Sequence, residues 1–148
     1  MKADRTRLKR YSMEITKNSA DLKELVDKNS LTPESVELKA AKYILIELAE
    51  AISNTLQHIL AKDKGIAVSG YVDTIVKGFK ENIISEDLFE KLKPFLDFRN
   101  SLVHRYWDID DTRLISNIRE GKEDFVQFVD AIEKYLMAND KSSSKGDA

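Results

Sequence analysis

The chain contains no cysteine and only two histidines, His58 and His104, among its 148 residues. The absence of cysteine excludes disulfide frameworks, thiolate metal sites and a cysteine nucleophile. With two histidines and no His-Glu-x-x-His spacing, a zinc site would have to depend on carboxylates. The sequence therefore predicts a protein with no metal site and no bound cofactor.

Glycine and proline are also scarce, with five and two residues. This argues against an all-β protein, which needs many turns. No run approaches the ~18 apolar residues that cross a membrane. The charged start from Met1 to Arg5 lacks the apolar stretch of a secretory signal. We therefore expect an intracellular, cytoplasmic protein without membrane contact.

An excess of positive charge is missing as well. The 24 Lys and Arg residues stand against 26 Asp and Glu residues, which leaves a net charge of −2. A protein that coats duplex nucleic acid through bulk charge would be strongly basic, so any contact with nucleic acid must be local. Arg5, Arg7, Lys9 and Arg10 form one basic cluster, either a solvated helix start or a patch that faces phosphate.

What the sequence does have is apolar residues at helical spacing. Thr32 and Pro33 suit the cap and first turn of a helix, and Gly65 suits the end of one. Pro94 should bend the fourth helix, and Gly121 can split or kink the fifth. The five predicted helices cover residues 5–29, 32–62, 71–81, 86–106 and 112–137. The second is the most hydrophobic, which predicts a central position.

These elements predict an all-α fold, an antiparallel bundle of about five helices with a kinked fourth helix. We expect a single helical domain over residues 1–138. Residues 139–148 contain no apolar residue before Ala148, so we expect a disordered tail.

The most informative stretch lies at the end of the predicted fourth helix. The apolar stripe of this helix, continued in register, places Arg99 and Tyr106 on the buried face. An arginine on that face must be paired, or must line a cavity or an interface.

His104 follows Arg99 by five residues, a rotation of about 140° on a helix. One straight helix would not point both side chains at one atom. Three explanations stay open: a distorted helix end, a wide groove, or a two-fold axis that joins Arg99 of one copy to His104 of another.

Arginine and histidine suit phosphodiester chemistry without a metal. The arginine fork holds a phosphate through two hydrogen bonds. A histidine takes or gives a proton near neutral pH, and RNA supplies its own nucleophile, the 2′-OH. The alternative is structural, with Arg99 paired to a carboxylate and His104 next to the helix dipole. We interpret His58, within the second helix, as structural or exposed.

Residues 99–106, RNSLVHRY, resemble the Arg-x4-His-x-Tyr motif of HEPN domains, and in particular the HepT-like toxins. The resemblance extends from about Arg5 to Met137. It includes Ala49-Glu50-Ala51, where relatives often carry Gly-Glu-Ala, and the Asp-Ile-Asp that follows Trp107.

The resemblance implies a metal-independent ribonuclease, the toxin of a type VII toxin–antitoxin pair, with a composite active site at a homodimer interface. It implies that Arg99 holds the phosphate, that His104 is the general acid or base, and that Asn100 orients the substrate or His104. It also implies a partner, an MntA-like nucleotidyltransferase antitoxin, which transfers AMP to Tyr106 and so excludes RNA.

Two other functions stay open. The chain could be a non-catalytic nucleotide- or substrate-binding partner subunit of a minimal nucleotidyltransferase, in which Arg99 serves binding. A purely structural dimer is the other alternative. The complete motif favours the nuclease, because a binding subunit does not need His104.

Overall fold

The computed structural model describes the backbone of residues 2–147 and the side chains of residues 2–140, and every regular element in this part of the chain is helical. The elements are α1 (Arg5–Asp27), α2 (Val36–Lys64), α3 (Gly70–Lys80), α4 (Glu86–His104), the 3-10 turn η1 (Tyr106–Asp108), α5 (Asp111–Gly121) and α6 (Asp124–Asp147). This confirms the all-α class. None of the described helices combines the length and the apolar character needed to cross a membrane.

Six α-helices are described where the sequence predicted about five, because the predicted fifth helix is split. α5 ends at Gly121 and α6 begins at Asp124. Glycine weakens a helix interior through its backbone entropy. A Cβ at position 121 would also lie 3.2 Å from Asp124 Oδ2, so the break is closely packed.

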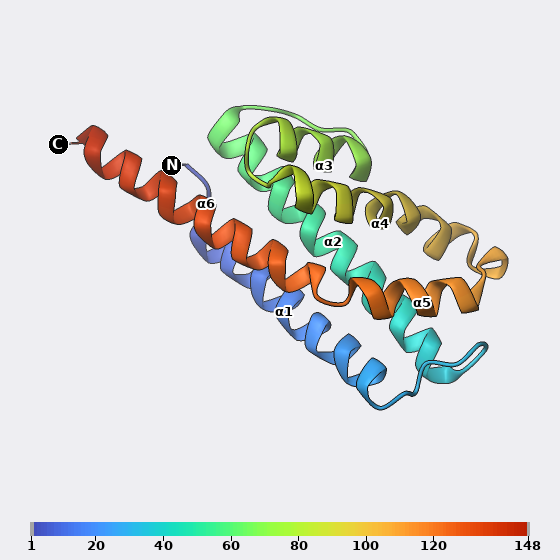
Figure 1. Ribbon diagram of the computed structural model, residues 1–148. Coiled ribbons are helices and arrows are strands. Elements are labelled where there is room, and N and C mark those ends of the chain that lie inside the picture. Colours follow the sequence, from blue (N-terminus) through green and yellow to red (C-terminus); the bar gives the residue numbers. More distant parts are fainter. Residues whose placement is uncertain (1, 148) are drawn as a thin grey trace.

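α2 is the centre of the bundle, as its apolar band predicted. It is buried on nearly every turn from Leu38 to Leu60. α1 packs along it, α3 and α4 pack against it and against each other, and α6 runs beside α1 (Figure 1). Burial of each leucine or isoleucine contributes about 1.5–3 kcal/mol. Gly78 of α3 packs closely on α2, since a Cβ there would lie 3.2 Å from the side chain of Leu56.

The start of α2 differs from the predicted start at Thr32. The N-cap is Ser35, whose hydroxyl accepts a hydrogen bond from Leu38 N–H at 3.0 Å. Glu34 has a φ of 61°, a left-handed conformation that cannot continue a helix. Thr32 and Pro33 therefore lie in the turn before the helix, and the predicted cap at Thr32 is wrong.

The first residues of the chain are held by the end of α2. Asp63 Oδ1 accepts hydrogen bonds from the backbone N–H groups of Lys2 and Ala3, at 2.9 and 3.0 Å. The N–H of Asp4, which caps α1, donates to His58 Nε2 at 2.7 Å. His58 is buried. Of the two interpretations, structural or exposed, the structural one is therefore correct.

The predicted disordered tail of residues 139–148 begins inside α6. Asn139 donates to the carbonyl of Tyr135 at 2.8 Å, and Arg5 forms an ion pair with Asp140. The side chains of residues 141–148 lie outside the described residues, so for them disorder stays a prediction.

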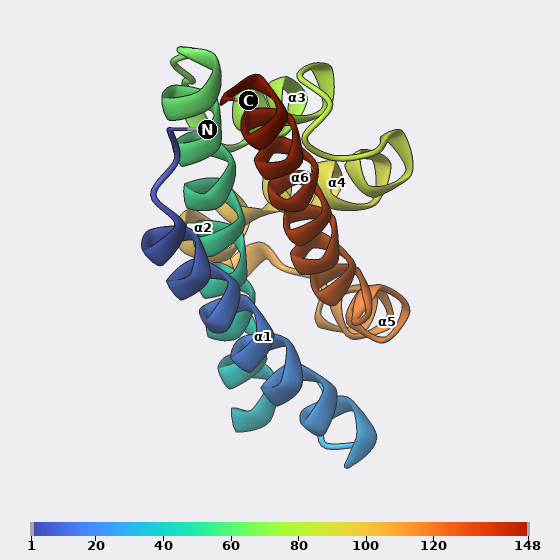
Figure 2. The same cartoon turned by 90° about the vertical axis from the view of Figure 1, so that its left-hand side faces the viewer.

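α5 lies at the end of the bundle where α1 ends and α2 begins. Figure 2 shows α1, α2 and α6 running along the length of the molecule, with α5 beside this end. The connection from α4 to α5, which carries the last residues of the motif, lies at the end opposite the N and C labels (Figure 1).

Candidate functional site

α4 carries the first part of the motif as one continuous helix. It begins at the cap Ser85, whose hydroxyl accepts a hydrogen bond from Leu88 N–H at 3.2 Å, and it runs through Pro94 to His104. Whether Pro94 bends it stays a prediction. Arg105 has φ −135° and ψ 36°, so the helix ends two residues before Tyr106.

This helix end corrects the predicted position of Tyr106. The residue belongs to η1 instead of α4, and its side chain is 63% exposed. The apolar register of α4 placed it on the buried face, but that register stops where the backbone leaves the helical conformation. Tyr106 is therefore a surface residue.

Arg99 lies where the register predicted, on a face of α4 that packs against other helices, and its side chain is 19% exposed. Its Nη2 lies 3.5 Å from Glu50 Oε1 on α2. Its Cζ lies 4.7 Å from the ring centroid of Tyr71 on α3. Its Nη1 donates to the adjacent Asn100 Oδ1 at 3.4 Å. Three helices thus meet at one guanidinium.

The pairing of Arg99 with a carboxylate, which the sequence left open, is present, but it uses only part of the hydrogen-bonding capacity of Arg99. Glu50 is half exposed and reaches one nitrogen at a long distance, so the pair contributes little. Arg99 Nε is buried and has no hydrogen-bond partner among the described residues. The face of Tyr71 supports the guanidinium plane through a cation–π contact, and the five N–H donors of the guanidinium are only partly used among the described residues.

Tyr71 is a site residue that sequence reasoning missed. Nothing in its spacing relates it to Arg99, 28 positions further along the chain. The contact arises because α3 and α4 pack side by side.

His104 is the last residue of α4, and its side chain is exposed. Because the helix is continuous from Arg99 to His104, the two side chains point about 140° apart. A distorted helix end therefore does not join them within one chain. A wide groove and a two-fold axis remain. Asn100 is exposed beside Arg99.

η1 presents two aromatic rings to solvent. Tyr106 is 63% and Trp107 73% exposed. The ring centroids lie 5.3 Å apart at an interplanar angle of 83°, an edge-to-face pair. Arg105 and Asp108 flank the rings and form an exposed ion pair at 3.3 Å.

A pocket of about 420 Å³ opens beside η1, between the second half of α4 and α5. Phe98 and Leu114 supply apolar walls, and Ser101, Arg105 and Arg113 supply hydrogen-bonding groups. Among these residues, Ser101 lies on the side of α4 away from Arg99, because the helical rotation of about 100° per residue places it about 160° from Arg99 and about 60° from His104.

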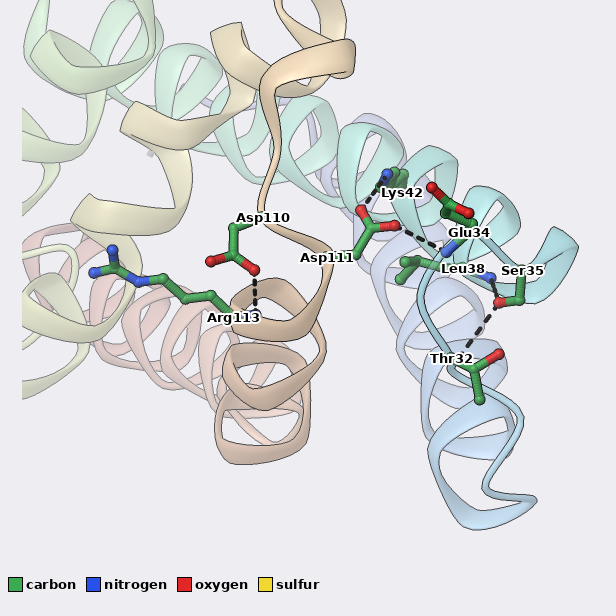
Figure 3. Close-up of polar contacts among 8 residues, drawn as sticks. All are labelled: Thr32, Glu34, Ser35, Leu38, Lys42, Asp110, Asp111 and Arg113. Carbon is green, nitrogen blue, oxygen red and sulfur yellow. Dashed lines mark hydrogen bonds and ion pairs between the residues drawn. The ribbon is translucent and has the colours of Figure 1, made fainter.

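The chain that follows η1 is anchored at two consecutive aspartates. Asp110 caps α5, and its carboxylate accepts a hydrogen bond from Arg113 N–H at 3.2 Å. Asp111 reaches across to α2, where it accepts from Lys42 Nζ and from Glu34 N–H, both at 2.9 Å (Figure 3). The hydrogen bond from Lys42, followed by that from Glu34, holds the pKa of Asp111 below its usual range. The Arg113 side chain extends away from this cluster (Figure 3).

Comparisons with known proteins place these residues in a family. The family model described as Ribonuclease HepT-like matches residues 14–132. A candidate RNase of Archaeoglobus fulgidus is 30% identical over 101 residues, which cover 68% of this chain and 76% of that protein.

Two solved structures share the fold at low identity. The tri-AMPylated HEPN toxin of Shewanella oneidensis, solved in complex with its MNT antitoxin, has a TM-score of 0.80 at 19% identity and covers 88% of this chain and 99% of its own. YutE of Bacillus subtilis, described as a cytosolic protein of unknown function, has a TM-score of 0.80 at 20% identity and covers 94% and 95%. The family model spans most of the helical bundle and includes the whole motif from Arg99 to Tyr106, so this chain belongs to the HepT-like ribonuclease family.

Proposed function

We propose that this chain is a metal-independent ribonuclease that acts as the toxin of a type VII toxin–antitoxin pair in the cytoplasm. Its membership in the HepT-like ribonuclease family supports the activity. The HEPN toxin that shares its fold was solved with an MNT antitoxin, which supports the toxin role. The observation that carries the proposal is the motif itself, with a partly buried and incompletely paired Arg99 and an exposed His104 on one helix.

In the proposed reaction Arg99 binds the scissile phosphate of RNA. Its guanidinium remains charged at every relevant pH and offers paired N–H donors to the phosphate oxygens. As the 2′-OH attacks phosphorus, negative charge grows on these oxygens and strengthens the contact. Tyr71 holds the guanidinium plane, and the phosphate displaces the weak contact with Glu50.

His104 moves the proton. It acts either as the general base that takes the proton of the attacking 2′-OH or as the general acid that gives a proton to the 5′-oxygen as its bond to phosphorus breaks, and the other proton is exchanged with water. The products are a cyclic 2′,3′-phosphate and a free 5′-OH. Asn100, next to Arg99, orients the substrate or the imidazole.

Tyr106 is the proposed site of inactivation by an MntA-like nucleotidyltransferase antitoxin. Its side chain is 63% exposed, so the hydroxyl group can reach a bound ATP in a partner. The hydroxyl oxygen gives its proton to a base of the antitoxin or to water and attacks the α-phosphorus of ATP, and pyrophosphate leaves. The attached AMP adds a bulky anion one residue beyond the pair His104 and Arg105, which excludes RNA by volume and by charge repulsion.

The test is RNA cleavage in the presence of EDTA, with mass spectrometry showing first that Tyr106 is unmodified. We expect wild-type chain to cleave a mixed RNA pool and His104→Ala to lose at least about 100-fold, the usual contribution of a general acid or base. The fold should be unchanged, because His104 is exposed.

Lys93→Ala is the matched control, an exposed residue of α4 outside the motif, and it should cleave at the wild-type rate. Unchanged cleavage by His104→Ala would contradict its assignment as the proton-transfer group. No cleavage by an unmodified, dimeric wild type would favour the nucleotide-binding partner subunit, and titration with ATP would follow.

A further inference from the structure

Trp107 is an exposed aromatic residue that the motif chemistry does not use. Trp107 is 73% exposed, and its ring makes an edge-to-face contact with that of Tyr106. The described side chains include one other exposed aromatic residue, Tyr43 on α2. Two of these three exposed rings therefore stand next to each other in η1.

The indole lies close to the proposed reaction centre. Trp107 follows His104 by three residues, so their Cα atoms are at most about 11 Å apart. The next residue, Asp108, lines the pocket of about 420 Å³ together with Arg105 and Arg113. A nucleotide whose base lies on Trp107 would thus have space for its sugar, and for its phosphate Arg105 and Arg113 beside the carboxylates of Asp108 and Asp110, which line the same pocket.

The local charges show why such a contact is needed. Arg99 is already shared with Glu50, and Arg105 with Asp108. The whole chain has a net charge of −2. Long-range attraction for a polyanion is therefore weak, and affinity for RNA requires a contribution that does not depend on charge. Stacking of a base on an aromatic ring supplies one, and it tolerates any sequence because every base has a flat apolar face.

We propose that the indole of Trp107 is a stacking platform for an unpaired base of single-stranded RNA, near His104, the proposed proton-transfer group. Bases of a duplex have both faces covered by their neighbours, so the platform selects single strands, loops and ends. The proposal rests on the proposed ribonuclease function and names the substrate class of the same site.

The first experiment measures the fluorescence of Trp107, the only tryptophan in the chain. The full-length His104→Ala variant is titrated with a short single-stranded RNA of mixed sequence without internal pairing, and separately with the same sequence as a duplex. We expect saturable quenching by the single strand and little by the duplex. Binding of the single strand without a change in fluorescence contradicts the platform, and so does the absence of binding.

The second experiment measures the affinity of labelled RNA for variants in the same His104→Ala background. Trp107→Ala should weaken binding by about 5- to 150-fold, the range for loss of one stacked base. Trp107→Phe retains a ring and should lose less. Met137→Ala is the control, because it removes an apolar side chain that is 60% exposed on α6. Equal affinity of Trp107→Ala and its parent overturns the proposal.

Salt provides a third, independent measurement. With one or two phosphates bound, the logarithm of the binding constant should fall with the logarithm of salt concentration at a slope of about −0.7 to −1.4. A slope steeper than about −3 would indicate binding by many phosphate contacts and contradict a stacking platform.

Sedimentation of Trp107→Ala without RNA tests the competing role of the exposed ring. If this variant becomes monomeric while the parent is a dimer, Trp107 belongs to an interface between copies and the platform is wrong. The platform and the ribonuclease function fail separately. Quenching by RNA without cleavage by the wild type would contradict only the ribonuclease function. Cleavage that is unchanged in Trp107→Ala would contradict only the stacking platform.

Discussion

At the scale of single residues, His58 connects the start of the chain to the central helix. Its Nε2 accepts the hydrogen bond from Asp4 N–H at 2.7 Å, which requires that this nitrogen carries no proton. Burial lowers the pKa of His58 first. The charges of Arg7 and Lys62 lower it further, and those of Asp4 and Asp63 partly oppose them.

This hydrogen bond predicts a loss of stability in mild acid. The pKa of His58 in the folded state lies below its ordinary value of 6.5, so the unfolded chain binds the proton more readily. The stabilisation of the fold by neutral His58 is complete above pH 6.5. It is lost as the pH falls from 6.5 towards the lower pKa of His58 in the folded state. We expect the free energy of unfolding in urea, measured as a function of pH, to decrease through this window.

His58→Gln isolates the effect, because its amide oxygen can accept the same hydrogen bond without titrating. Below pH 6.5 the free energy of unfolding of wild type should therefore decrease relative to that of this variant as the pH falls. A difference that is constant with pH would show that protonation of His58 does not weaken the fold.

At the scale of elements, Asp111 joins α5 to the start of α2. The carboxylate pairs with Lys42 at 2.9 Å, with side-chain exposures of 17% and 21%, and it accepts the N–H of Glu34. Because Glu34 has a positive φ, this hydrogen bond also supports a strained turn. The contacts fix the chain three residues after η1 and therefore the position from which the aromatic pair projects.

Asp111→Ala should lower the free energy of unfolding by about 1–3 kcal/mol, because Lys42 and Glu34 N–H both lose a charged partner. Urea denaturation measures the change. The stabilisation requires the ionised carboxylate, whose folded-state pKa is lowered, so it is complete above the ordinary value of 3.8 and is lost as pH falls below it.

Glu24→Ala is the matched control for this element. It removes a carboxylate from an exposed pair with Lys28, for which a small change is expected. Equal effects of the two substitutions would show that the contact between α5 and α2 does not stabilise the fold.

At the scale of the whole molecule, the directions of Arg99 and His104 favour two copies. They lie on one continuous helix and point about 140° apart, so a site that uses both is completed most simply by a second chain across a two-fold axis. We therefore expect sedimentation to show a dimer at micromolar concentration.

Mixing two inactive variants tests the composite site directly. A dimer of one Arg99→Ala chain and one His104→Ala chain would contain one site with both residues intact. An equilibrated equal mixture should therefore recover roughly a quarter of wild-type cleavage, since half of its dimers are mixed. A monomeric wild type, or a mixture no more active than either variant, would indicate that each site is built within one chain. Sedimentation of Arg99→Ala must show that it still dimerises.

Much of the fold could be predicted from local sequence. The apolar spacing located the helices, Gly65 marked the end of α2, and Gly121 marked the break between α5 and α6. These features depend on residues within one or two turns, whose backbone preferences and capping hydrogen bonds act locally. The motif from Arg99 to Tyr106 could likewise be found by its resemblance to a family.

The tertiary structure decided the features that join distant residues. The predicted cap at Thr32 failed because Asp111, far along the chain, binds the N–H of Glu34 in a conformation that excludes helix. The predicted burial of Tyr106 was wrong because α4 ends before this residue. The contacts of Arg99 with Glu50 and Tyr71 depend on how three helices pack. Sequence by itself located most of the helices and identified the motif. Packing decided which residues contact one another and which are exposed, because contacts and exposure depend on distances in space that spacing along the chain does not encode.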